Sequence, residues 1–225
     1  MNRRPRKVLV VIDPGVHTPE IDSLNLISTL SSIPCTYHLP AMYGFGTLSH
    51  SYVDMAGIII LGSAASVHDN LSWQRELESF VAGAIEQEVP VLGCCYGLQM
   101  LAYMFKGQVG FVLESREKLK GVRTVSMRKN ALFDAGDHDV IVTHAEMVTR
   151  VPDDFSIIAT SNIVTVEGIA HKRKPVYGFQ FHPEATQQFL RGHEMKNEKT
   201  ISALGAGHKI IQQFVHMAEG LDNFK

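Results

Sequence analysis

The chain has 225 residues, of which 45% are hydrophobic, with a mean hydropathy of +0.01 and a formal net charge of −2. This composition predicts one globular domain over residues 1–225 and gives no reason to expect a nucleic acid or an acidic membrane as partner. The basic start, Met1–Lys7, precedes an apolar run only as long as one strand, and no segment approaches the roughly twenty apolar residues that cross a bilayer. Three cysteines without paired spacing favour a reducing compartment, so we expect a cytoplasmic location.

Apolar strands alternate with amphipathic helices in the first half of the chain. Strands are expected at Lys7–Asp13, Cys35–Leu39, Ala56–Leu61 and Glu88–Leu92, and helices at Ile21–Leu30, from Trp73 to Ile85 and directly after Cys95. The third strand, AGIIIL, has the continuous apolar character of a strand buried on both faces. The stretch His38–Tyr52 is rich in Gly, Pro and Ser and is expected to be a loop. The alternation predicts an α/β fold with a mostly parallel, doubly wound sheet flanked by helices.

After Phe105 the pattern changes to short β-like runs separated by turn signals. These runs are Val109–Leu113, Val122–Met127, Val140–Val142, Ser156–Ala159, Ile163–His171 and Pro175–Phe181. We expect them to form antiparallel strands added to the parallel half, followed by a last helix with an apolar face from Ile210 to Ala218.

The segment PVLGCCYGLQ, Pro90–Gln99, places two adjacent cysteines between a strand and a helix. A sharp corner of this kind holds its central residue in a strained conformation and closes only when small residues stand two positions before and after it. Gly93 and Gly97 have this spacing around Cys95 but not around Cys94. Cys95 is therefore the candidate nucleophile and Cys94 a buried residue at the end of the strand. Buried cysteines commonly serve only packing, so the corner alone leaves both interpretations open.

A second motif, His182-Pro183-Glu184, follows the strand that ends at Phe181. A cysteine nucleophile needs a base, and imidazole suits that role near neutral pH when an acceptor fixes its tautomer. His182 and Glu184 are two residues apart, so in extended backbone they project to the same side. Since strands of a parallel sheet end at one edge, this motif and the Cys95 corner are expected to meet there. A tripeptide of this kind alone would more commonly be a surface turn.

Together these segments resemble a known family. GCCYGLQ and YGFQFHPEAT are similar to motifs of the class I, triad-type glutamine amidotransferases, most closely the amidotransferase domain of GMP synthetases. IIILGSAASV stands where the family has its oxyanion strand, and VTHAEMV where GMP synthetases carry a Ser-His-Gly-Asp-like segment. The resemblance covers about Lys7 to Thr186 and implies the flavodoxin-like fold of this family.

The resemblance also implies a mechanism. The Cys95 thiolate, at a helix N-terminus whose dipole favours an anion, would attack the carboxamide of glutamine and form a γ-glutamyl thioester. His182 would protonate the departing ammonia and then activate water, and Glu184 would orient His182. No metal or other cofactor is expected, because the remaining histidines lack metal-ligand spacing.

Two further groups of residues are carried over from the family. Backbone N–H groups would hold the oxyanion, contributed by Tyr96 and by Gly62 or Ser63. Substrate contacts are implied for Gln99, Thr143, His144 and Ala145, with the backbone as the expected contact at His144. The sequence departs from the family at the oxyanion loop, where Gly62-Ser63-Ala64-Ala65 replaces the common Gly-Gly-Pro. Without the proline we expect a flexible loop that a docked partner would order.

Ammonia from such domains normally passes to a second active site. The sequence has neither a Gly-x4-Gly-Lys-Ser/Thr loop nor a Ser-Gly-Gly-x-Asp-Ser-like loop to hold nucleotide phosphates, so a synthetase partner in trans is implied. Two alternatives stay open. One is a γ-glutamyl peptide or amide hydrolase that uses the same thioester, and the other is a binding or regulatory protein that keeps the fold without turnover.

Overall fold

The computed structural model describes residues 7–49 and 54–220. Within these residues the centre of the molecule is a nine-stranded sheet in the order β2-β1-β3-β4-β11-β10-β9-β6-β7. The first five strands are parallel: β2 (Cys35–His38), β1 (Val8–Ile12), β3 (Met55–Ile60), β4 (Val91–Cys94) and β11 (Val176–Phe179). The other four continue it in antiparallel fashion: β10 (Gly168–His171), β9 (Phe155–Thr160), β6 (Leu119–Met127) and β7 (Gly136–His144). A separate two-stranded sheet pairs β5 (Gln108–Phe111) with β8 (Glu146–Arg150).

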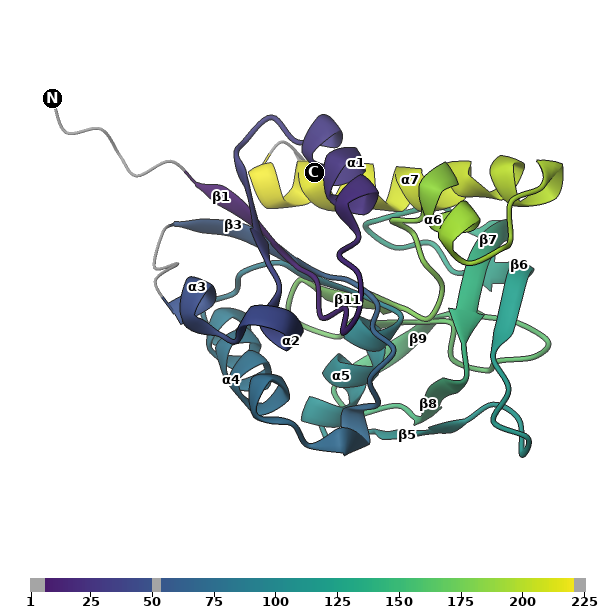
Figure 1. The fold of residues 1–225 in the computed structure, drawn as a ribbon, viewed down its shortest axis with the longest axis horizontal. Coiled ribbons are helices and arrows are strands. Elements are labelled where there is room, and N and C mark those ends of the chain that lie inside the picture. The colour runs from purple at the N-terminus through teal and green to yellow at the C-terminus, as the bar shows by residue number, and fades with distance from the viewer. Residues whose placement is uncertain (1–6, 50–53, 221–225) are drawn as a thin grey trace, which may run out of the picture.

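Helices cover both faces of the large sheet (Figure 1). One face carries α1 (Ile21–Leu30), α6 (Gln187–Gly192) and α7 (Glu198–Glu219), and the other carries α2 (Pro40–Tyr43), α3 (Gly46–Ser49), α4 (Ser72–Glu86) and α5 (Tyr96–Met104). Successive strand side chains point to opposite faces, so β1 contributes to two cores. Val10 packs in the core that holds Leu77 of α4, whereas Leu9 packs in the core that holds Phe214 of α7. The predicted α/β class, with a parallel sheet extended by antiparallel strands, is confirmed.

Several predicted boundaries are wrong. The strand before the cysteines begins at Val91, because Glu88 takes a left-handed conformation (φ +59°) in the turn that ends α4. The stretch His38–Tyr52 contains the short helices α2 and α3 in its described part, and residues 50–52 lie outside the described residues. Three elements were not predicted, β8, α6 and the 3₁₀-helix η1 (Val67–Asp69), since each is too short to show a period of its own.

The most consequential correction concerns β11. It was expected among the antiparallel strands, but it lies parallel to β4, with Phe179 opposite Cys94, and antiparallel to β10. It is therefore the strand that joins the two parts of the sheet. Because β4 and β11 run in the same direction, they end at the same edge, one at the cysteine corner and the other just before His182.

Candidate active site

The corner at Cys95 has the strained geometry that the glycine spacing predicts. Cys95 has φ +51° and ψ −99°, a conformation that a residue with a side chain rarely adopts, and its N–H donates to the Phe179 carbonyl of β11 at 2.7 Å. A Cβ at Gly93 would lie 2.4 Å from the Gly97 carbonyl carbon, and one at Gly97 would lie 2.6 Å from the Ile60 carbonyl oxygen. Gly93 is needed because backbone approaches backbone across the corner, and Gly97 because the end of β3 approaches it.

The two cysteines differ in their surroundings. Cys94 is fully buried, and this burial, followed by the nearby Glu184 carboxylate, raises the pKa of its thiol well above the usual value. Cys95 stands at the start of α5 and lines a cavity of about 430 Å³. Only Cys95 therefore presents its sulfur to a space that a substrate can enter, whereas the Cys94 thiol stays neutral and enclosed.

His182 and Glu184 form a buried pair beside Cys95. The Nδ1 of His182 and the Oε1 of Glu184 are 2.8 Å apart, and the His182 backbone N–H donates to the Ile141 carbonyl at 2.8 Å. Burial by itself lowers the pKa of His182, but the charges of Glu184 and Cys95 and the hydrogen bonds to both outweigh it and raise that pKa well above the usual value. The other ring nitrogen, Nε2, is buried without a hydrogen bond of good geometry among the described residues. The pair therefore leaves one nitrogen free for a proton transfer.

The loop after β3 closes over this pair. A Cβ at Gly62 would lie 2.7 Å from His182 Cε1 and 3.7 Å from Cys95 Cβ, so the Gly62 backbone lies directly against both residues. The Ser63 hydroxyl donates to the Pro14 carbonyl at 2.7 Å and accepts from the Ala65 N–H at 3.1 Å. The Ser63 side chain thus links this loop to the loop after β1, and the expectation that a docked partner orders it stays a prediction.

Of three other predicted site residues, one lines the cavity and two have side chains that make internal hydrogen bonds. Thr143 lines the cavity, together with Gly62, Ser63, Cys95, His182 and Glu184. Tyr96 is fully buried, and its hydroxyl accepts a hydrogen bond from the Gln74 amide at 3.2 Å. The Gln99 amide donates to the Glu146 carbonyl at 2.8 Å, so its side chain serves an internal hydrogen bond in this structure. The substrate role of Gln99 and the oxyanion role of Tyr96 stay predictions.

His144 belongs to a buried ionic network rather than to the cavity wall. Its Nε2 is 3.0 Å from Arg123 Nη1, which also pairs with Glu167 Oε1 at 2.8 Å. Burial, and then the Arg123 charge, lower the pKa of His144 to about 4, so the ring is neutral near pH 7. The role expected for its backbone, and for that of Ala145, also stays a prediction.

Sequence reasoning missed the loop between β1 and α1, which forms one wall of the cavity with residues 15–20, together with the first two residues of α1, Ile21 and Asp22. The fully buried Asp13 carboxylate shapes this loop by accepting from the Gly15 N–H at 2.8 Å, the Glu20 N–H at 2.7 Å and the Tyr37 hydroxyl at 2.5 Å. An aspartate and a glycine directly after the first parallel strand could have been noticed, because that position is at the edge where ligands bind.

The short helix α6, also unpredicted, forms another wall. The ring of Phe189 packs between His182 and His193, with centroid distances of 4.7 and 4.3 Å. Gln188, Phe189 and His193 line the cavity, and so does Lys118 from the loop before β6. The aromatic contact and the hydrogen bond to Glu184 both limit the rotation of the His182 ring.

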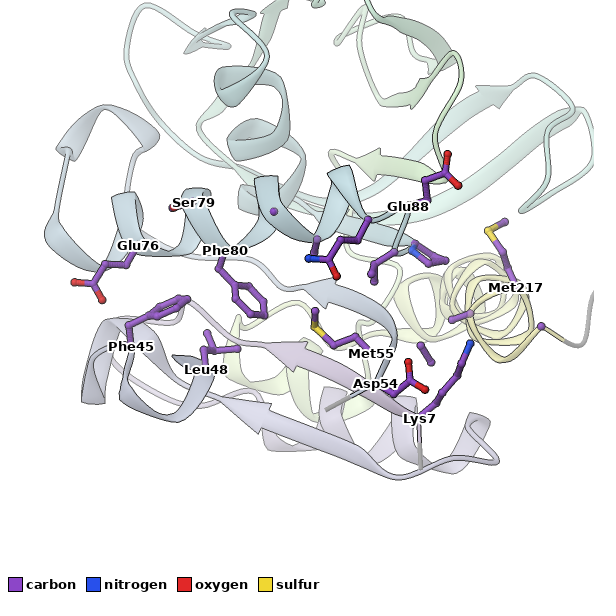
Figure 2. A pocket seen from close by; sticks show the side chains of 18 residues that line it. Lys7, Phe45, Leu48, Asp54, Met55, Glu76, Ser79, Phe80, Glu88 and Met217 are labelled. Atoms are coloured by element: carbon purple, nitrogen blue, oxygen red, sulfur yellow. The ribbon is translucent and has the colours of Figure 1, made fainter. Parts of the chain in front are cut away.

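A second, larger hollow lies away from the predicted site residues (Figure 2). Its volume is about 970 Å³. Its lining includes Lys7, Asp54 and Pro90, each directly before a parallel strand. It also includes Phe80 of α4 and Phe45, which directly precedes α3. Since this is the amino edge of the parallel strands, it is opposite the edge at which Cys95 and His182 meet.

Two further properties apply to the described part of the chain. Residues 7–49 and 54–220 contain no cluster of three or more His, Cys, Asp or Glu side chains placed to hold a metal ion. In the same ranges, every helix is too short or too polar to cross a membrane.

Comparison with known proteins identifies the family. The family model for the class-I glutamine amidotransferases matches residues 10–201. A GMP synthase [glutamine-hydrolyzing] of Mesoplasma florum is 36% identical over 146 residues, which is 64% of this chain and 27% of that protein. The corresponding enzyme of Lactococcus lactis subsp. lactis is 33% identical over 73% of this chain and 31% of that protein. The chain thus matches about a third or less of the length of these curated relatives.

Solved structures show the same fold. A Thermoplasma acidophilum protein described as a GMP synthase subunit superposes with a TM-score of 0.74 at 20% identity, covering 96% of each chain. A glutamine amido transferase of Methylobacillus flagellatus superposes with a TM-score of 0.71 at 16% identity, covering 96% of this chain and 95% of that one. The segment that the family model matches includes both the Cys95 corner and the His182 motif. The chain belongs to the class-I glutamine amidotransferase family of enzymes, as its sequence predicts.

Proposed function

We propose that this chain hydrolyses the side-chain amide of glutamine through a thioester on Cys95, with His182 as acid and base and Glu184 as the residue that orients His182. The observation that carries the proposal is the buried His182–Glu184 pair, 2.8 Å between Nδ1 and Oε1, beside a cysteine held at φ +51° in the wall of a cavity. A thiol, a base and an orienting carboxylate are the three groups that this chemistry requires.

The reaction takes two steps. The Cys95 thiolate attacks the carboxamide carbon, and the tetrahedral intermediate collapses when protonated His182 gives its proton to the departing amine, which leaves as ammonia. His182, now neutral, takes a proton from water as the water attacks the thioester. This releases glutamate and restores the Cys95 thiolate beside a protonated imidazole. The raised pKa of His182 supports this starting state, because a proton is retained on the ring next to the sulfur.

Backbone N–H groups of Gly62, or of Ser63, and of Tyr96 stabilise the oxyanion. The contact of Gly62 with both Cys95 and His182 supports this role, because a donor must lie next to the attacked carbon. The tether between Ser63 and Pro14 holds this loop within the chain itself.

The ammonia passes to a synthetase partner in trans, and the chain acts in the cytoplasm as a single domain over residues 1–225. The relatives named GMP synthase [glutamine-hydrolyzing], of which this chain matches about a third or less, support a synthetase of that kind. The continuous sheet supports one domain, and the three cysteines, all free, support a reducing compartment. No metal, other cofactor, nucleic acid or membrane takes part.

A second candidate is a γ-glutamyl amide or peptide hydrolase. The cavity volume of about 430 Å³ favours it, because pockets of this size hold ligands larger than an amino acid. The chemistry at Cys95 would be the same. Only the leaving group would differ, because an amine or amino acid would leave in place of ammonia when the thioester forms.

Release of ammonia and glutamate from glutamine tests the proposal, with the purified chain compared with Cys95→Ala and with a panel of γ-glutamyl amides and dipeptides. We expect turnover of glutamine that requires Cys95. Faster hydrolysis of the γ-glutamyl dipeptides would favour the second candidate. No turnover of any substrate, with or without a synthetase, would favour a binding protein that keeps the fold.

A further inference from the structure

Glu20 stands in the wall of the same cavity and has no assigned role. It is the last residue of the β1–α1 loop, where its backbone N–H donates to the Asp13 carboxylate at 2.7 Å, and its half-buried side chain lines the cavity with Cys95, His182 and Glu184. Within residues 7–49 and 54–220 its carboxylate makes no ion pair and accepts no hydrogen bond. The loop thus places an uncompensated acid where a substrate would lie.

The electrostatic surroundings of Glu20 are acidic. Burial, followed by the charges of Glu184 and Asp13, raises its pKa to about 7, while His182 acts in the opposite direction. The charged or titratable groups facing it are Asp13, His17 and Asp22 on its own segment, Tyr37 of β2, Lys118, His182, Glu184 and His193. A cation that enters the cavity stabilises the charged form of such a carboxylate, because it offsets the repulsion from the other acids.

An independent observation marks the same cavity as a ligand site. The side chain of His182 is 5% exposed, and its Nε2, buried beside Cys95, has no partner of good geometry in the described part of the chain. In glutamine the ammonium nitrogen is four bonds from the carboxamide carbon, about 5 Å in an extended molecule. A substrate whose carboxamide meets Cys95 and His182 must therefore place its ammonium group against a wall of the same small cavity.

We infer that Glu20 recognises the α-ammonium group of the γ-glutamyl substrate, which makes it a specificity-determining residue of the proposed hydrolase. The inference rests on the proposed function, since it takes Cys95 as the point where the substrate amide lies. The Glu20 carboxylate accepts hydrogen bonds from the ammonium group, and the bound cation offsets the charges of Asp13 and Glu184. Amides that lack the ammonium group lose this contact, so the site selects α-amino acids over simple carboxamides.

The experiment compares glutamine with glutaric acid monoamide, which lacks only the α-amino group. We expect the unaltered chain to prefer glutamine in kcat/KM by about 10- to 100-fold, which is the range for a hydrogen bond to a charged group. Glu20→Gln should reduce the preference to within about 3-fold, through a higher KM for glutamine, while turnover of the monoamide stays nearly unchanged. Glu20→Asp should keep part of the preference. Glu86→Gln, the same charge change at an exposed position on α4, should keep all of it.

Calorimetry measures the binding of glutamine and of the monoamide to two proteins, Cys95→Ala and the double variant Cys95→Ala/Glu20→Gln. This tests the inference even if turnover is slow. The inference is supported if Glu20→Gln weakens the binding of glutamine and leaves the binding of the monoamide unchanged. It is also supported if glutamine binding weakens below pH 7 when Glu20 is present but not in Glu20→Gln. Equal preference before and after Glu20→Gln overturns it. Hydrolysis by Cys95→Ala would instead overturn the proposed function, so the two failures are distinguishable.

Discussion

Gly62 lies so close to His182 that the ring leaves no room for a side chain: a Cβ at Gly62 would lie 2.7 Å from His182 Cε1. Carbon atoms that are not bonded prefer separations of about 3.5–4.0 Å, so one of the two residues would have to move. Since the ring is held by Glu184 on one side and Phe189 on another, the displacement would disturb the contact between the base and Cys95.

Gly62→Ala should therefore lower glutamine turnover by about a hundredfold or more, the usual cost of misplacing an oxyanion donor. Its thermal unfolding should change less than its turnover, because the collision is with one side chain and not with backbone. The control is Gly83→Ala in α4, where an added Cβ meets nothing within 4 Å and alanine favours the helix. Equal turnover in the two variants would contradict the placement of Gly62 at the site.

Labelling distinguishes the two adjacent cysteines. A glutamine-like diazoketone should alkylate Cys95, which lines the cavity, and spare Cys94, whose thiol is fully buried and held neutral by burial and Glu184. Peptide mapping by mass spectrometry identifies the adduct. Cys95→Ala should abolish hydrolysis, while Cys94→Ala should retain most of it. An adduct on Cys94 or Cys35 would show that the nucleophile is assigned to the wrong residue.

Replacing His182 should reduce turnover more than replacing Glu184. His182→Ala removes the proton transfer in both steps and should lower kcat by about a hundredfold to ten-thousandfold. Glu184→Gln keeps the base but loses the carboxylate that raises the pKa of His182, so partial activity should remain and its pH profile should change. Steady-state kinetics across pH measure both effects. Near-normal turnover in His182→Ala would contradict the proposed mechanism.

The buried pair Arg123–Glu167 should matter for stability. Their side chains are 5% and 0% exposed, so Arg123→Met leaves the Glu167 carboxylate buried without a cation, which costs about 3–5 kcal/mol in the free energy of unfolding. The exposed pair Lys129–Asp134 provides the control, because Lys129→Met should cost under about 1 kcal/mol. Urea unfolding measures both. A small effect at Arg123 would mean that water reaches Glu167.

His144 should make stability depend on pH. Its pKa is lowered to about 4 in the folded chain by burial and Arg123, from about 6.5 in the unfolded chain. A lowered pKa means that the unfolded chain binds the proton more tightly, so this contribution to stability is present above pH 6.5 and is lost as pH falls toward 4. His144→Gln should remove part of this acid sensitivity when unfolding is followed from pH 7 to 4. An unchanged pH dependence would contradict a buried, neutral His144.

Part of this site could be predicted from the sequence because it depends on short-range sterics. Gly93 leaves room for the Gly97 backbone across the turn at Cys95, and the observed φ of +51° agrees with the prediction. Gly97 also leaves room for the Ile60 carbonyl of β3, a contact that the spacing did not show. The alternation of apolar strands and helices likewise determined the α/β class, because the periods of strands and helices are local properties. His182 and Glu184 meet as predicted, with 2.8 Å between Nδ1 and Oε1, but the expected extended backbone is wrong: the Ala185 N–H donates to the His182 carbonyl at 3.2 Å and closes a turn at Pro183 and Glu184.

Only the tertiary structure decided which strands lie side by side. β11 pairs with β4 although the whole antiparallel part of the sheet lies between them in the chain, and that pairing brings His182 to Cys95. A strand shows its own period in the sequence but not which free edge it joins, because that choice depends on every other strand competing for the same edge. The same holds for Glu20, Gln99 and His144. Such a polar side chain either lines the cavity or makes an internal hydrogen bond. Which of the two it does is determined by neighbours that the fold brings from distant parts of the chain.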